Sequence, residues 1–403
     1  MGWLVFDDQH VDQVHEFLKD KAAGSIDQLG FRRLQLSFSN QLCPGVSTQH
    51  TRLRYLYFIP WAYQLAAERY REGLSASSEQ DESFQAHLDR VEYQLIEQLK
   101  GEGDPRTGII GVSKGKQTKN KAGSLYWSAL DKWGVRKADI NRRDFVRAVE
   151  QFASRSQAAS PAAGEDPLEY DTTAADARAM ANPWHKNLRK APDAFLVQHE
   201  NLPFSLSSEE RDYLQEYVAT SKTFEYSMVR YLLHECQKEE ALEAIQHDNI
   251  WGFSEQCSSE LRERLERARK FAEITYTADF AYAYYATLEA GRDSLDASQI
   301  EPYIKRVPDY DIDDILHEHD AREETYDFLK VWQGLLSRPG NSALDEPEVR
   351  EAIVERERDM KQKKARLTHP ELLEKKDSYS ASIQSFRWPT LTQFAQDFWG
   401  VES

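Results

Sequence analysis

The chain of 403 residues carries 68 acidic against 51 basic side chains, a formal net charge of −17, and 11% of its residues are aromatic. This balance favours a helical protein with a charged surface and an aromatic core, and it argues against a general nucleic-acid coat protein. Three widely spaced cysteines form no CxxC pair, so neither a disulfide framework nor a zinc knuckle is supported. The opening MGWLVFDDQH lacks the basic and apolar regions of a signal peptide, and we expect a cytoplasmic protein.

Apolar periodicity predicts a mainly α fold, with an N-terminal helical domain at 1–153 and a C-terminal helical bundle at 183–403. Residues 154–182 are rich in Ala, Ser, Pro and Asp, a composition typical of a linker. The helices expected before the first glycine-rich loop run from Asp7 or Asp8 to Lys21, from Ile26 to Leu42, from Leu53 to Ala67 with a kink at Pro60, and from Phe84 to Leu99.

The C-terminal bundle opens with a capping-box pattern, in which Ser207 and Glu210 stand three residues apart before a helix to Ser221. The helices expected after it span Phe224 to Cys236, Glu239 to His247, Ser258 to Ala290, Ile312 to Leu336 and Pro347 to Leu367. The closing FRWPTLTQFAQDFWG is aromatic, and we expect it to dock on the core.

Residues 101–147 are different in character from their surroundings. A glycine-rich basic stretch, 101–123, indicates a mobile or ligand-ordered loop with a possible short strand. A helix from Ser124 to Trp133, stopped by Gly134, then precedes a helix from Arg142 to Phe152. This order resembles the outline of a helix-turn-helix, a combination that many helical bundles also contain.

The charge of the chain is distributed unevenly. Arg106 to Arg147 contains 11 basic and 3 acidic residues, a net charge of +8, so the remaining residues carry −25. Lysines on a glycine-rich loop can neutralise phosphates, and aromatic rings beside them can stack on bases. The residues that we expect to hold phosphates are Lys114, Lys116, Lys119, Lys121, Arg136, Arg142, Arg143 and Arg147, with Tyr126 and Trp127 as stacking groups. The alternatives are a solvated basic surface, or one that docks on an acidic surface, with Trp127 in the core.

A second cluster is acidic and contains histidine, in the stretch PDYDIDDILHEHD at 308–320. On a helix, Asp313 and His317 share a face and could bind a divalent ion, but acidic residues also favour the N-terminus of a helix by its dipole alone. We favour that structural interpretation. His50, Arg52 and Arg54 precede the apolar helix, and an ion pair with the acidic C-terminal half explains them as well as a pocket does.

Four blocks carry a family resemblance: GWLVF, LCPGVSTQHTRLRYLYFIPWAY, IIGVSKGKQTKNKAGSLYWSALDKWGVR and FRWPTLTQFAQDFWG. They are similar to an uncharacterised bacterial family, known only as a domain of unknown function. The resemblance implies a setting and no activity, because relatives are often encoded beside helicase-like and phospholipase-D-like nuclease proteins in loci that look like phage defence.

These observations together favour a cytoplasmic, non-enzymatic subunit that contacts DNA or RNA and acts with a helicase or nuclease partner, without a cofactor, a metal or a membrane. The first alternative is a metal-dependent nuclease that uses the acidic cluster. The second is a protein–protein adaptor that makes no contact with nucleic acid.

Overall fold

The computed structural model describes residues 27–75, 83–100, 108–115, 118, 120–137, 140–158, 182–197, 200, 202–337, 343–373 and 379–401. The helix expected to end at Lys21 and most of the expected linker lie outside them. Within the described residues the protein is helical and has no strand, and an isolated antiparallel bridge pairs Arg136 with Trp184. The predicted mainly α class is therefore confirmed. No described helix is long and apolar enough to span a membrane.

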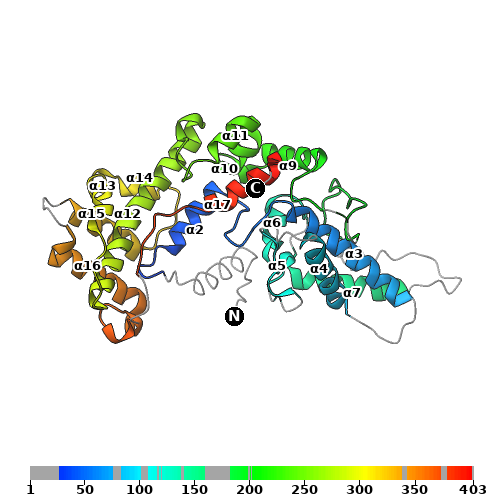
Figure 1. Ribbon diagram of the computed structural model, residues 1–403, viewed down its shortest axis with the longest axis horizontal. Helices are drawn as coiled ribbons and strands as arrows, with labels where there is room; N and C mark the ends of the chain where they lie inside the picture. Colours follow the sequence, from blue (N-terminus) through cyan, green and yellow to red (C-terminus); the bar gives the residue numbers. More distant parts are fainter. Residues whose placement is uncertain are drawn as a thin grey trace.

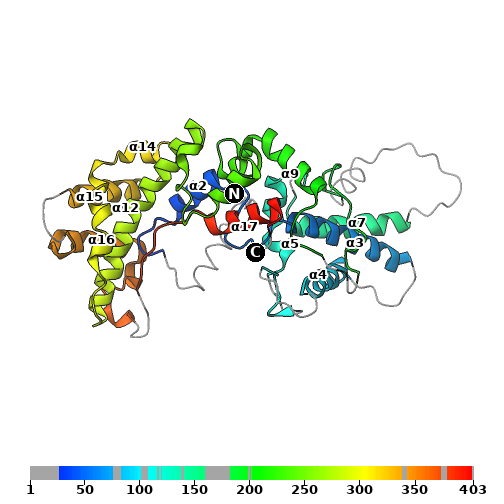
Figure 2. The ribbon, with the colours of Figure 1, turned by 45° about the horizontal axis from the view of Figure 1, so that its top comes forward.

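The helices form two bodies and a middle segment along one elongated molecule (Figures 1 and 2). One end, which we call the basic body, contains α3 (Tyr55–Ser75), α4 (Phe84–Lys100), α5 (Ala122–Leu125), α6 (Trp127–Lys132) and α7 (Arg142–Ala158). The opposite end, the long-helix body, contains α12 (Ser259–Glu289), α13 (Glu301–Ile304), α14 (Ile312–Leu316), α15 (Glu323–Leu336) and α16 (Pro347–Lys361). The middle segment contains α2 (Arg32–Leu42), α9 (Ser208–Thr220), α10 (Met228–Arg230), α11 (Lys238–Ala244) and α17 (Trp388–Trp399).

The central helix of the basic body is α3, which runs through Pro60. Every residue from Tyr55 to Tyr63 is buried, as the apolar pattern all round this stretch predicts. The helix packs along α4 and contacts α7. This arrangement encloses the aromatic side chains of the stretch and leaves the outer faces of α4 and α7 to polar residues.

The start of α2 is later than expected because of one carboxylate. The side chain of Asp27 accepts hydrogen bonds from the backbone N–H groups of Gly30, Phe31 and Arg32, which closes a turn before the helix. Gly30 lies in this turn with φ +78°, a conformation that glycine adopts without strain.

The long-helix body is organised by α12, whose N-terminus is capped by the Ser258 side chain. The single helix expected from Ile312 to Leu336 is interrupted, and it forms α14 and α15. The interruption turns His319 inward, where its Nδ1 lies 2.8 Å from Ser37 Oγ and its ring lies against Phe38 of α2. Packing against α2 therefore overrides the local helical pattern.

The predicted division at 154–182 does not separate two cores, because the buried apolar side chains form one continuous cluster. From the first predicted domain, Phe38 of α2 stacks on Phe271 of α12 at 4.6 Å between ring centroids. From the second, α17 returns to the start of α3, where Asp397 forms an ion pair with Arg52 at 2.6 Å. Packing across the boundary thus joins elements that are far apart in the sequence.

The helix-turn-helix outline is not formed. The expected helix Ser124 to Trp133 is divided into the short helices α5 and α6, and residues 133–141 then lead to α7. The motif needs a turn of about three or four residues between two full helices. The connection here is longer and largely buried, since Trp133, Val135 and Ile140 belong to the core.

Candidate nucleic-acid interface

Four aromatic rings pack together in the interior of the basic body. Tyr63, Trp127, Phe145 and Trp184 lie with ring centroids 5.5 to 6.1 Å apart. The indole N–H of Trp127 donates to the Ile140 carbonyl at 2.8 Å. Trp127 is therefore a core residue, and its prediction as a stacking group does not fit this position.

Tyr126 is also part of the interior and has no exposed surface. Its hydroxyl accepts hydrogen bonds from the N–H groups of Thr51 and Arg52 and donates to the Arg52 carbonyl. Burial raises the pKa of this hydroxyl. The Tyr126 side chain thus links the segment before α3 to the start of α6. Because Tyr126 is buried, its prediction as a group that stacks on bases does not fit this position.

Two of the expected phosphate-binding arginines face inward. Arg136 is 2% exposed, donates to the Ile140 carbonyl at 2.8 Å, and lies with its guanidinium 5.1 Å from the Trp127 ring centroid. Arg142 is partly buried, and its Nε donates to the Tyr63 hydroxyl at 2.6 Å. Arg136 has no surface to offer a phosphate, and Arg142 is held by the protein itself.

A buried carboxylate lies between the basic loop and the helices below it. Glu92 of α4 is 5% exposed, and its Oε1 accepts from the Gly123 N–H at 3.0 Å, whereas its Oε2 has no hydrogen-bond partner among the described residues. Burial raises the pKa of this carboxyl, although Arg142, the Gly123 N–H and Lys121 act in the opposite direction. Lys121 itself forms an ion pair with Asp89 at 2.5 Å.

A small cavity with room for about one water molecule adjoins Glu92. It is lined mostly by apolar side chains, those of Tyr55, Ile59, Ala62, Leu95, Ile96, Ile110 and Ala122, together with Lys121. Gly123 closes the cluster, because a Cβ atom there would collide with the Tyr63 hydroxyl and the Glu92 carboxylate. Tyr63, Glu92, Gly123 and Arg142 thus join α3, α4, α5 and α7, and their polar groups are directed inward.

Residues 108–115 of the basic loop form a series of turns and not the expected short strand. Two hydrogen bonds hold the beginning of these turns against the residues at the start of α3. Thr51 Oγ1 donates to the Gly108 carbonyl at 2.6 Å, and the Ile110 N–H donates to the Tyr55 hydroxyl at 2.9 Å. Ile109 and Ile110 are buried, and Lys114 is exposed. Lys116 and Lys119 lie outside the described residues.

The outer face of α7 provides the other exposed cations. Arg143 and Arg147 stand four residues apart on the side opposite the buried Phe145, and both are exposed. Arg147 has a long contact of 3.5 Å with Asp144, in which the two side chains are 62% and 50% exposed to solvent. Such a pair contributes little stability and leaves the arginine available. Of the expected phosphate-binding residues, Lys114, Arg143 and Arg147 thus lie on the surface.

Sequence reasoning missed a second source of basic side chains. Residues 182–197, expected to open the C-terminal domain, lie on the basic body and expose Lys186, Arg189 and Lys190. The stretch PWHKNLRK carries the signal, but its place after the expected linker does not reveal that it packs on the basic body.

The acidic cluster is used for structure. Asp311 caps α14 by accepting from the N–H groups of Asp313 and Asp314. Asp313 then pairs with Lys330 at 2.8 Å, and Asp314 pairs with Arg267 at 3.1 Å. Within the part of the chain that the structure describes, no three His, Cys, Asp or Glu side chains gather as metal ligands do. These contacts of Asp311, Asp313 and Asp314 are those of the structural interpretation.

The three polar residues before α3 also act structurally, as the ion-pair interpretation predicts. Arg52 pairs with Asp397 of α17, and Arg54 pairs with Glu210 of α9 at 2.9 Å. His50 accepts from the Ser47 N–H through Nδ1, and its Nε2 lies 3.1 Å from the Leu125 carbonyl. These contacts fix the segment before α3 between α17, α9 and α5.

The fold and the site thus define a helical protein with an aromatic core, one end of which exposes lysines and arginines from a pinned loop, a helix and an adjoining segment. Residues 1–151 match the model of a family of unknown function, DUF6361. This match confirms the expected likeness to an uncharacterised family for that part of the chain, which includes the LCPGV and IIGV blocks. No curated protein and no solved structure matches the chain.

Proposed function

We propose that the protein is a non-enzymatic subunit that contacts the phosphate backbone of DNA or RNA through the exposed cations of its basic body. Lys114, Arg143 and Arg147 carry this proposal, joined by Lys116 and Lys119 of the same loop. The observation behind it is that Lys114, Arg143 and Arg147 are exposed and belong to a segment with a net charge of +8, while the rest of the chain carries −25. An acidic remainder confines attraction for a polyanion to one end of the molecule.

The chemistry of this surface is that of positioning and not of base reading. Lysine and arginine contacts to phosphate give affinity that depends steeply on salt and carries no sequence information. The rings that could read bases, Tyr126 and Trp127, are buried. A protein of this kind holds a nucleic acid for another protein to act upon.

The resemblance in the opening blocks supports the choice of partner. Relatives of this family are often encoded beside helicase-like and nuclease-like proteins. We infer that a helicase or nuclease of this kind acts on the bound strand, within a system of defence against phage.

The proposal is tested by reversing the exposed charges together, with Lys114, Arg143 and Arg147 each changed to Glu. We expect wild-type protein to bind labelled single-stranded or duplex DNA at low salt, and the triple variant to lose more than about tenfold in affinity. Fluorescence anisotropy measures both. None of the three side chains is part of the core, so the fold is retained.

The matched control reverses three exposed lysines of the long-helix body, Lys305, Lys363 and Lys364. These changes alter the net charge by the same amount, and binding should weaken only slightly. Equal losses in the two variants would contradict a localised interface. Wild-type protein that binds neither strand form at low salt would refute the proposal, and tight binding to polyglutamate in place of DNA would identify an adaptor for an acidic protein.

A further inference from the structure

We propose that residues 182–197, called here the strap, form with Lys137 a second phosphate-contacting strip that extends the interface beyond the loop and α7. This inference rests on the proposed function and specifies its ligand as the sugar–phosphate backbone, with duplex favoured over single strand. The strap begins some thirty residues after the family match ends at residue 151. The backbone that carries its basic residues is held by contacts at its beginning, middle and end.

The first anchor is at the beginning of the strap. Its backbone pairs with residues 135–137, since the Lys137 N–H donates to the Pro183 carbonyl at 2.8 Å and the His185 N–H donates to the Val135 carbonyl at 2.9 Å. Between these bonds, the Trp184 ring enters the aromatic cluster and is 4% exposed. Lys137 and Lys186 therefore lie beside an isolated backbone bridge, that of Arg136 and Trp184.

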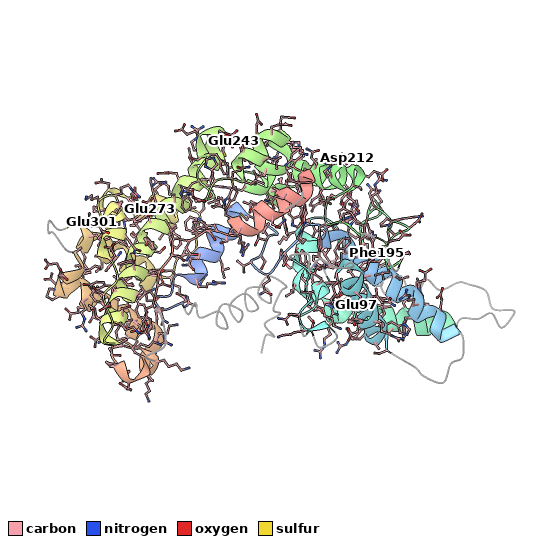
Figure 3. The ribbon with its side chains drawn as sticks, viewed as in Figure 1. Glu97, Phe195, Asp212, Glu243, Glu273 and Glu301 are labelled. Atoms are coloured by element: carbon pink, nitrogen blue, oxygen red, sulfur yellow. The ribbon has the colours of Figure 1, made fainter. Side chains whose placement is uncertain are left out.

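The second anchor lies at the middle and the end. The indole N–H of Trp61 donates to the Arg189 carbonyl at 2.7 Å, and the Phe195 ring packs edge-on against Trp61. Figure 3 labels Phe195 on the basic body. The Gln98 side chain of α4 accepts from the Leu196 N–H at 2.8 Å and donates to the Ala194 carbonyl at 2.6 Å. Leu196 has φ +59°, a conformation that costs a leucine free energy and is held by these contacts.

The cations between the anchors face solvent. Lys137, Lys186 and Lys190 are exposed and form no ion pair within the described chain. The Arg189 side chain forms an ion pair with Glu209 at 3.3 Å, in which the two side chains are 49% and 63% exposed. Because the backbone beneath is already ordered, binding a polyanion here orders side chains alone, which lowers the entropic penalty of association.

The chemistry of the strip selects the ligand. Its aromatic rings, Trp184 and Phe195, are buried, so the strip has no platform on which unpaired bases could stack. What remains is a group of exposed ammonium groups, which can neutralise phosphates. Duplex DNA carries about one charge per 1.7 Å of helix axis, a higher linear density than a single strand, and such a strip favours it.

The experiment measures the salt dependence of binding to a labelled duplex of mixed sequence and to its labelled single strand. Each phosphate contact contributes about 0.9 to the slope of log affinity against log salt on duplex. We expect Lys186→Gln with Lys190→Gln to reduce that slope by about 2, and Lys137→Gln to reduce it further by about 1. The matched control, Lys363→Gln with Lys364→Gln on the long-helix body, should leave the slope unchanged.

The outcomes separate this inference from the proposed function. If wild-type protein binds and the Lys114, Arg143 and Arg147 variant weakens binding, but the strap variants keep the wild-type slope, the strap inference alone fails. If wild-type protein binds no nucleic acid, both fail. An equal change of slope in the control pair, or displacement of the duplex by polyglutamate as readily as by heparin, also overturns the inference. An unchanged urea midpoint for each variant shows that the fold is intact.

Discussion

Glu92 in the basic body and Glu273 in the long-helix body are both buried, 5% and 3% exposed, but their surroundings differ. Glu273 of α12 pairs with Arg269 at 2.7 Å and with Arg306 at 3.0 Å, and it accepts from the Tyr310 hydroxyl. Glu92 accepts one backbone N–H, and its second oxygen has no partner among the described residues.

The same contrast holds for the charges at the surface. In the long-helix body the acidic residues of α14 find basic partners on α12 and α15. In the basic body Lys114, Lys137 and Arg143 lie exposed and form no ion pair with a described residue. Charged residues that pair with one another stabilise the fold. Exposed cations that form no ion pair with a described residue are available to a ligand.

The largest effect that tests this contrast is expected from Glu273→Ala. The change removes the shared acceptor of two arginines, and we expect the free energy of unfolding to fall by about 3 kcal/mol, at the lower end for a buried pair because the arginines reach solvent. Urea unfolding measures it. Glu301→Ala on α13 is the control, because its contact with Lys305 is long, 3.9 Å, and exposed. A loss of less than about 0.5 kcal/mol for both would contradict the role given to Glu273.

A smaller effect is expected where α14 meets α2. Burial lowers the pKa of His319 to about 4, with Arg267 and Arg264 acting in the same direction and Glu318 opposing them. In the unfolded chain His319 takes up a proton near pH 6.5, whereas in the folded protein it takes up a proton only near pH 4. The contribution of neutral His319 to the free energy of unfolding is therefore complete above pH 6.5 and is lost as the pH falls toward 4. Between pH 7 and pH 5 we expect a loss of about 2 kcal/mol.

His319→Asn tests the source of that loss. Asparagine keeps an acceptor for Ser37 and does not titrate, so the variant should lose less stability than wild type over the same interval. His317→Gln, an exposed neighbour, is the control and should leave the dependence on pH as it is. Equal pH slopes for wild type and His319→Asn would show that His319 does not exclude the proton.

The opposite sign, with a smaller effect, is expected for Glu92. Since burial raises its pKa in the folded state, the folded protein retains a proton that the unfolded chain has released. Its contribution to stability is therefore complete at low pH and decreases as pH rises above the ordinary range of a glutamate. Glu92→Gln should be more stable than wild type at pH 8, with the difference disappearing toward pH 4. A variant less stable than wild type at pH 8 would mean that the ionised carboxylate has a compensating partner.

Much of the fold was accessible from the sequence where local signals agree with packing. The enclosed stretch Tyr55 to Tyr63, the Ser207 capping box and the long helix α12 follow from apolar pattern and cap chemistry alone. The interruption between α14 and α15 was not, because it depends on where His319 meets α2, a contact between residues far apart in sequence.

The candidate site shows the same limit. A count of charges finds the segment Arg106 to Arg147, but it cannot separate Arg143, which is exposed, from Arg136, which is 2% exposed. The outcome depends on Trp184, whose ring and backbone cover that side of the basic body. Since Trp184 follows the expected linker, nothing local to the basic segment reveals the difference.

The ion pair between Arg52 and Asp397 joins residues 345 positions apart. On a ribosome, the segment before α3 emerges long before α17, the helix that completes its surroundings. Leu53 also donates its N–H to Asp397, so the backbone there stays without this acceptor until α17 docks. The segment before α3 therefore completes its hydrogen bonds only after α17 has been synthesised and has docked.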